Sequence, residues 1–193
     1  MRVFSQFALR TAQTLALLLL ALTLVRPVSA QTTAPNETIQ VIVQQQQVIS
    51  QTYKLERAGV WVMHLKTIAL LAAYGGWTRD DKVMRRENLE LKKYLSRLKP
   101  ELVHAMTAVQ RNKSISEDDL KRFSDIHRNV ETLCAVAIDV HEMLEDGKID
   151  EANALYRDKS IDLIQAINAD SYTLISSLEE KIDKAALHAR LAK

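Results

Sequence analysis

Apolar residues along most of the chain recur at intervals of three and four, which is the spacing of one face of an α-helix. The pattern continues from Thr38 to Tyr74, where it predicts a first helix, and resumes from Arg79 to Arg111, where it predicts a second. Only four glycines and three prolines occur in the 193 residues, so little interrupts these patterns. The sequence therefore predicts long helices joined by short turns.

Capping signals place two of the turns. Gly75 and Gly76 end the first pattern, and Thr78 with Asp81 then forms a capping-box pattern for the second helix. Ser116 with Asp119 repeats that pattern at the start of a third helix. A capping side chain accepts a hydrogen bond from a free amide of the first turn, so these positions favour helix starts.

Two further positions limit the remaining helices. Gly147 ends the third apolar pattern, and Asp150 is a suitable cap for a fourth helix that runs to the C-terminus. Pro100 lies inside the second pattern, where it removes a backbone donor and predicts a kink or a short break near Lys99. The four glutamines at 44–47 are interpreted as a solvated turn of the first helix.

Four long helices joined by short turns run antiparallel to their neighbours. We therefore expect an all-α fold, an elongated antiparallel up-down-up-down four-helix bundle over residues 38–193. A helix from Thr38 to Tyr74 would be roughly 55 Å long at 1.5 Å per residue, so the bundle is expected to be a rod.

The first thirty residues have the three parts of an export signal. Arg2 and Arg10 give a positively charged start, the run from Leu15 to Val25 is apolar, and Val28 to Ala30 supplies small residues before a cleavage site. We therefore expect a signal peptide over residues 1–30, followed by a flexible lead-in over residues 31–37.

An uncleaved anchor is the alternative, because the stretch from Ala8 to Val25 approaches the roughly 20 apolar residues that a membrane helix needs. No later segment is expected to be apolar enough to span a bilayer. Both alternatives predict a protein of the periplasm or the medium that meets the membrane only through this N-terminal segment.

Charge and cysteine usage narrow the class further. The predicted signal takes three arginines and no acidic residue, so the formal charge of +2 becomes −1 after cleavage. This near-neutral value argues against nucleic acid as a partner. Cys134 is the single cysteine, which excludes an internal disulfide and a covalently attached haem, and it is interpreted as a small buried hydrophobe.

No motif of catalysis stands out, so we expect a protein that is not an enzyme and holds no metal or cofactor. The five histidines form no pair at i, i+4 and no Glu-x-x-His motif, so neither a zinc site nor a di-iron site is predicted. A haem held between Met63 and a residue of the fourth helix such as His188 is an alternative that helical bundles allow.

Two stretches carry a resemblance to known domains. The segment Arg57-Ala58-Gly59-Val60-Trp61-Val62-Met63 resembles the first helix of type IV pilus and nitrate-responsive sensory domains, with Ala58, Gly59 and Met63 on the family's Ala-Gly-x-x-x-Met pattern. Val62 replaces an arginine that is common there, so the anion recognition of those domains is not implied. Gly147 to Ala152 resembles the loop before the last helix in periplasmic four-helix-bundle ligand-binding domains of bacterial methyl-accepting chemoreceptors.

The resemblance implies a chemoreceptor-like sensory or small-ligand-binding module without its own transmitter domain. Its ligand would lie between the first and fourth helices, or across the face of a homodimer, and a membrane sensor partner would receive the signal. The polar and aromatic residues available for binding are Arg57, Trp61 and Lys66 of the first helix and Asn168, Ser171 and Tyr172 of the fourth. The alternative is a structural or adaptor protein of the cell envelope that binds no ligand.

Overall fold

The computed structural model describes residues 33–75 and 80–191, except for the side chains of residues 33–36, 61 and 62. The predicted signal peptide over residues 1–30 therefore lies outside the described residues. Residues 34–193 form one compact unit.

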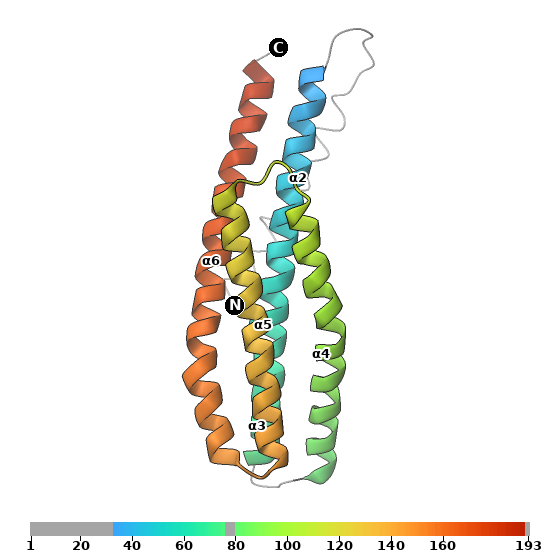
Figure 1. Ribbon diagram of the computed structural model, residues 1–193, viewed down its shortest axis with the longest axis vertical. Helices are drawn as coiled ribbons and strands as arrows, with labels where there is room; N and C mark the ends of the chain where they lie inside the picture. Colours follow the sequence, from blue (N-terminus) through green and yellow to red (C-terminus); the bar gives the residue numbers. More distant parts are fainter. Residues whose placement is uncertain (1–32, 76–79, 192–193) are drawn as a thin grey trace, which may run out of the picture. The chain divides into compact units, whose positions relative to one another are not determined.

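The described part of the chain consists of helices and the turns between them and contains no strand, which confirms the predicted all-α fold. Its elements form four antiparallel helical segments of the bundle, called arms below (Figure 1). The first arm is continuous and consists of three elements, whereas each later arm is a single helix. In chain order they are α2 (Thr33–Glu56), η1 (Arg57–Met63), α3 (His64–Gly75), α4 (Asp81–Gln110), α5 (Glu117–Glu145) and α6 (Ile149–Leu191).

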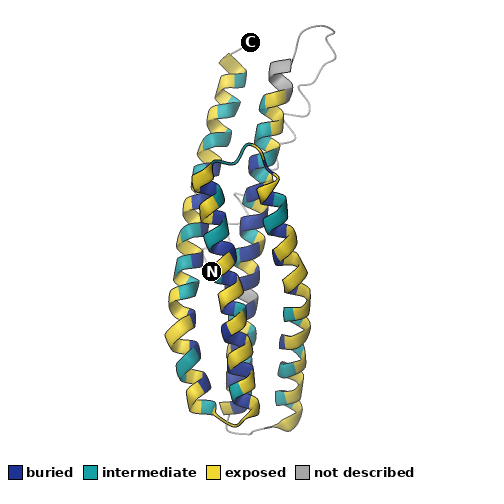
Figure 2. Ribbon diagram, viewed as in Figure 1, coloured by how far each residue is buried: buried dark blue, intermediate teal, exposed yellow. Residues whose placement is uncertain are grey.

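The core consists of the inward residues of all four arms, as Figure 2 shows by the buried positions along the facing sides of the helices. The helices α5 and α6 pack against each other along most of their shared length. The largest fully buried apolar side chains are Met63, Leu70, Leu91, Leu98, Phe123, Ile126, Leu133, Leu144, Ile167, Leu174 and Leu178.

The first and last helices extend beyond the connection between α4 and α5 at the same end of this unit (Figure 1). The connection is hydrogen-bonded to both of them. The Asn112 amide donates to the carbonyl of Gln44 on α2, at 2.8 Å. The hydroxyl of Ser116, at the end of the connection, accepts from the ammonium of Lys181 on α6 at 3.0 Å, and the neighbouring carboxylate of Asp119 in α5 accepts from Lys181 and Ser177. The two helices that protrude are therefore fastened to one loop.

Several boundaries differ from those expected. Helix α2 begins at Thr33, so most of the predicted lead-in is helical. Helix α4 is capped by Asp80, which accepts from the Lys82 amide at 2.8 Å, whereas Thr78 lies outside the described residues. Helix α6 begins at Ile149, which puts Asp150 in its first turn instead of at its cap. Ser116 and Gly147 cap and end α5 as predicted.

Helix α4 continues through Pro100 without the predicted break. A proline in a helix costs one backbone hydrogen bond, and Pro100 is exposed, so the carbonyl that it leaves unpaired faces water. On either side Leu98 and Leu102 are buried in the core. Their packing holds the helix together where the backbone bond is missing.

The glutamine tract is not fully solvated, contrary to the interpretation from sequence. Gln45 is 2 % exposed, and its amide donates to the carbonyl of Ser114 at 2.8 Å. A polar residue inside the bundle end is tolerated because this bond offsets part of its desolvation.

One described helical stretch, Glu37–Gly75, is long and apolar enough to cross a membrane by length and composition. This corrects the expectation that nothing after the N-terminal segment reaches that threshold. The same stretch supplies Met63 and Leu70 to the core of the bundle, and the core helix of a globular protein meets the same criterion.

Candidate functional site

The first arm contains a π-helical segment, η1, between two α-helices. Its wider turn is evident at His64, whose amide donates to the carbonyl of Gly59, five residues earlier. Such insertions inside α-helices are rare and occur often at functional sites. We therefore take η1 and the side chains that contact it as the candidate site.

The spacing of buried residues explains why the helix widens here. Leu55, Gly59, Met63 and Thr67 are all buried and follow one another at intervals of four. In an α-helix each such step overshoots a full turn by about 40°, so three steps would carry the last residue away from the core. The wider π turn absorbs this drift and keeps all four residues on the inner face.

Gly59 brings η1 against α5. A Cβ atom at this position would lie 2.9 Å from Cγ2 of Val130 and 3.3 Å from its Cγ1, closer than real side chains pack. Val130 is fully buried and, as a β-branched residue, has little freedom to move aside. The glycine is therefore required for the close contact between the two helices.

Tyr94 of α4 contacts η1 from another side. Its hydroxyl donates to the carbonyl of Ala58 at 3.0 Å. Burial raises the pKa of the Tyr94 phenol well above its usual value, and the charge of Glu101 adds to the effect. The phenol therefore stays protonated and serves as a hydrogen-bond donor to the π segment.

His64 and Tyr156 form a pair directly after η1, joining α3 to α6. The Nδ1 atom of His64 is hydrogen-bonded to the Tyr156 hydroxyl, which also lies 3.5 Å from the carbonyl of His64. The two rings are stacked, with centroids 5.8 Å apart and an interplanar angle of 23°.

The hydrogen bonds of this pair define its protonation. A tyrosine hydroxyl has one proton, so it can donate to the His64 carbonyl only if Nδ1 of His64 carries the other proton and donates to the hydroxyl oxygen. Burial lowers the pKa of His64, which favours the neutral ring, and raises the pKa of Tyr156 to about 12. The pair is therefore a neutral hydrogen-bonded contact.

Burial also keeps the single thiol near the site protonated. Cys134 is partly buried, and burial raises the pKa of its thiol to about 12, so the thiolate is scarce at neutral pH. Among the residues described, no group of three or more His, Cys, Asp or Glu side chains is placed to hold a metal ion. The arrangement is suited to holding a helix conformation.

The two ligands considered for a haem are far apart. Met63 is fully buried in η1, whereas His188 is exposed in the last turns of α6. The partner of His64 on α6 is Tyr156, which precedes His188 by 32 residues, or about 48 Å of helix. The haem alternative with these ligands is therefore wrong, because antiparallel helices bring together the start of one and the end of the other.

Of the candidate binding residues of the first arm, Lys66 contacts α4. Lys66 pairs with Glu90 of α4, with Nζ and Oε2 3.6 Å apart, and Arg57 is exposed. The side chain of Trp61 lies outside the described residues. The structure thus directs Lys66 toward the second arm.

The candidate residues of α6 lie further along the bundle. Asn168 is twelve residues beyond Tyr156, so it lies about 18 Å along the helix from the level of His64. Asn168 and Tyr172 are exposed, Tyr172 to 72 %. Ser171 is buried, and its hydroxyl has no hydrogen-bond partner within the described part of the chain. Asn168 therefore lies well away from the level of Lys66.

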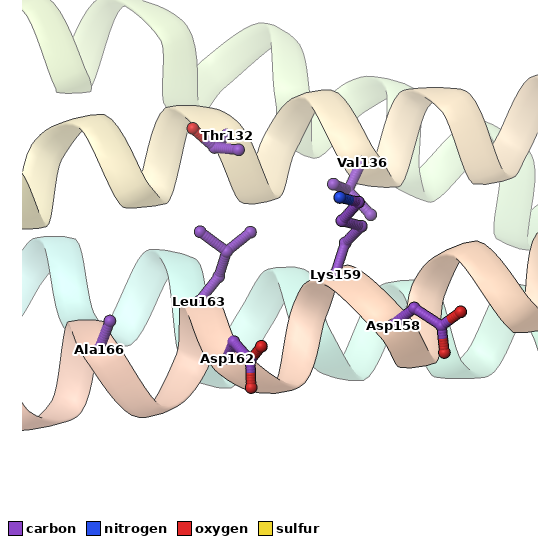
Figure 3. Close-up of a pocket in the computed structure, with 7 residues that line it drawn as sticks. All are labelled: Thr132, Val136, Asp158, Lys159, Asp162, Leu163 and Ala166. Atoms are coloured by element: carbon purple, nitrogen blue, oxygen red, sulfur yellow. The ribbon is translucent and has the colours of Figure 1, made fainter.

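Two hollows on the surface of the described bundle include none of those six residues. One lies in the groove between α5 and α6 (Figure 3), where Leu163 and Lys159 extend toward α5 and the Asp162 carboxylate points away from it. It is open to solvent and is lined by Thr132, Val136, Asp158, Lys159, Asp162, Leu163 and Ala166. The other lies near the α5–α6 turn and is lined by Tyr74, Met84, Leu144, Glu145, Gly147 and Ile149.

Sequence reasoning missed Tyr94 and Tyr156 because each contacts a residue far away in the chain. The run of intervals of four at Leu55, Gly59, Met63 and Thr67 was the available signal for the π segment. It was hidden because other apolar residues of the first arm fit an ordinary helical spacing.

The fold and site define the chain as an all-α protein of the four-helix-bundle class. No protein-family model, curated protein or solved structure matches the chain.

Proposed function

We propose that this chain is an exported, non-enzymatic sensory or small-ligand-binding module that passes its state to a separate membrane partner. The observation that carries the proposal is the π-helical segment in the middle of the first arm. The resemblance to type IV pilus and nitrate-responsive sensory domains rests on Ala58, Gly59 and Met63, and all three lie in this segment.

A π segment gives a helix two alternative arrangements. If η1 converted to α-helix, the extra residue would have to be absorbed elsewhere, and α2 would turn relative to α3 by about 100°, the rotation of one residue. The contacts of Tyr94 with Ala58 and of Tyr156 with His64 favour the π arrangement. A ligand shifts such an equilibrium only if it binds one arrangement more tightly than the other.

The protruding ends of α2 and α6 would transmit this change. The N-terminal part of α2 extends beyond the α4–α5 connection together with the C-terminal part of α6 (Figure 1). A rotation of α2 would therefore alter the surface of this end, where a partner could detect it. The groove that contains Lys159 suits a small polar ligand of negative charge, because it offers an ammonium group beside an apolar wall.

The expectation of a non-enzymatic protein is supported by the chemistry of the site. His64 and Tyr156 satisfy each other, and the Cys134 thiol is held protonated by burial. Catalysis by a nucleophile needs an activated group, whereas burial raises the pKa values of both Cys134 and Tyr156 to about 12.

A structural or adaptor protein of the envelope is the second candidate. Both described hollows are open grooves, and the inner faces of the arms are filled by apolar side chains. An adaptor would bind through its helix faces and would need no ligand. Export through the N-terminal segment is common to both candidates.

Thermal unfolding of the exported protein with small polar compounds separates the two candidates. A sensor ligand present at about 100 times its Kd would stabilise the fold by about 2.7 kcal/mol and raise Tm by roughly 5–10 °C. Hydrogen exchange with that ligand should then change at the amides of Arg57–His64 more than in α5. Stabilisation by no amino acid, organic acid or inorganic anion, together with an obligate dimer in sedimentation, would favour the adaptor.

A further inference from the structure

Helix α4 carries a strongly basic outer face. All seven of its lysines and arginines are exposed, against four acidic residues in the whole helix. The basic residues begin at Lys82 and end at Lys99, a distance of about 26 Å along the helix. In order they are Lys82, Arg85, Arg86, Lys92, Lys93, Arg97 and Lys99.

Six of these cations flank an exposed ridge of three apolar residues and one serine. Leu89, Ser96, Pro100 and Val103 follow at intervals of seven, four and three, so they form one line along the helix, opposite the buried residues Leu91, Leu98 and Leu102. The ridge residues are all exposed, Leu89 to 53 % and Val103 to 61 %.

The helical positions of the cations place them on both sides of this ridge. Arg86, Lys93 and Arg97 lie on the side of the first arm, where Glu90 pairs with Lys66. Arg85, Lys92 and Lys99 lie on the side of α5, where Lys92 is 3.7 Å from Glu145. This arrangement, an apolar line between two rows of cations, is typical of helices that lie in a membrane interface.

Much of the positive charge on this face is not neutralised by the protein. Within the described chain, Lys82, Arg85, Arg97 and Lys99 take part in no ion pair, whereas Lys92, Lys93 and Arg86 each have one. The acidic residues gather on the other side of the molecule, since α5 and α6 each carry eight of them, against three and five lysines and arginines. The bundle therefore presents one cationic face.

We propose that the outer face of α4 docks on a bilayer that contains anionic phospholipid. Lysines and arginines near such a surface are attracted to its head groups, while Leu89 and Val103 are free to enter the boundary of the acyl chains. A nucleic acid would use the cations equally, but it would leave the apolar ridge without a partner. A second copy could offer its acidic α5 and α6, but the groove between these helices contains Lys159, whose charge would repel the cations of α4, and self-association is one of the outcomes tested below.

The docking is tested on the full chain with a fluorescent label at Ser96→Cys, in a Cys134→Ala background, so that any binding by the N-terminal segment does not affect the readout. A polarity-sensitive label at position 96 should shift to the blue with vesicles of phosphatidylcholine and phosphatidylglycerol. It should not shift with phosphatidylcholine alone. The matched control is a label at Gln165→Cys, an exposed position on α6, which should not respond to either vesicle.

Charge variants measure the contribution of the cations. Arg85→Gln with Lys99→Gln removes two unpaired cations from the face and should weaken partition into the anionic vesicles about thirtyfold, or about 1 kcal/mol for each charge. The matched pair Lys54→Gln with Lys121→Gln removes two exposed cations from other helices. Its partition should stay within a factor of about three of the unaltered protein, because these charges lie away from the membrane surface when α4 is docked.

Three outcomes would overturn the proposal. The first is an unchanged label at position 96 with anionic vesicles. The second is an equal loss of partition in the two charge variants. The third is salt-sensitive self-association or binding to a DNA duplex that depends on Arg85 and Lys99 while the vesicles have no effect, which would assign the face to a second copy or to a nucleic acid.

Discussion

Replacement of Gly59 by alanine tests the closest helix contact in the candidate site. The added Cβ would lie 2.9 Å from Cγ2 of Val130, so either the valine or η1 must shift. Overpacking of this kind typically costs about 1–3 kcal/mol, whereas exchanging glycine for alanine in a helix contributes about 0.5–1 kcal/mol of stability. The expected net loss for Gly59→Ala is about 1 kcal/mol, which lowers Tm by roughly 2–4 °C for a chain of this size.

A double-mutant cycle identifies the cause of this loss. Val130→Ala alone should cost about 2–3 kcal/mol, because it empties part of a fully buried site. In the double variant the methyl group added at position 59 can occupy part of that space, so the two changes together should cost at least about 1 kcal/mol less than their sum. Unfolding by urea, followed by circular dichroism, measures all four proteins.

Gly75→Ala is the matched control. Its Cβ would lie 3.8 Å from the nearest side-chain atom, on Ile149, which is an ordinary contact. This variant should be neutral or slightly more stable. The reasoning about Gly59 is refuted if Gly59→Ala is as stable as Gly75→Ala, or if the Gly59 and Val130 changes are additive.

Other contacts of the bundle give four more predictions. Tyr94→Phe removes the donor to the Ala58 carbonyl and should lower the free energy of unfolding by about 1–2 kcal/mol. Hydrogen exchange should become faster in Arg57–Met63 than in α5, and equal exchange in both would contradict a specific stabilisation of η1 by Tyr94. Burial would raise the pKa of the Asp119 carboxyl, but the charge of Lys181 and the hydrogen bonds from Lys181, Ser116 and Ser177 outweigh it and lower the pKa below the ordinary 3.8. Its contribution is therefore present above about pH 4 and is lost as the pH falls through the lower folded-state pKa, and Asp119→Asn should flatten this part of the urea-stability curve against pH. Burial lowers the pKa values of His64 and His141 below 6.5, so stability should decline as the pH falls below that value, and a curve that rises there would contradict the folded-state assignment. The Cys134 thiol, with its pKa raised to about 12, should react with a thiol reagent at pH 8 far more slowly in the folded protein than in urea.

The number of helices and the approximate position of each turn could be predicted from the sequence. The periodic apolar residues indicated four helical stretches, and Ser116 and Gly147 marked the limits of α5 where the structure has them. Caps and glycines act on their nearest neighbours, so a single sequence contains what is needed to interpret them.

The candidate site could not be predicted in the same way. Its parts, Tyr94 against Ala58 and Tyr156 against His64, are separated by 36 and 92 residues. The candidate binding residues had been assigned to one interface from their polarity, but their levels along antiparallel helices decide whether they meet. Lys66 lies on the face of the first arm that contacts α4, where it pairs with Glu90, and Asn168 lies about 18 Å along α6 from Tyr156.

The sequence by itself determined that this protein is helical, where its turns lie, and that its N-terminus has the pattern of an export signal. Only the tertiary structure decided that the first arm widens into a π turn at Gly59 and that the cations of α4 share one outer face. Four of these cations have no acidic partner among the described residues. Helix formation follows from local spacing and capping, whereas a widened turn and an unpaired face depend on which surfaces the other three arms cover.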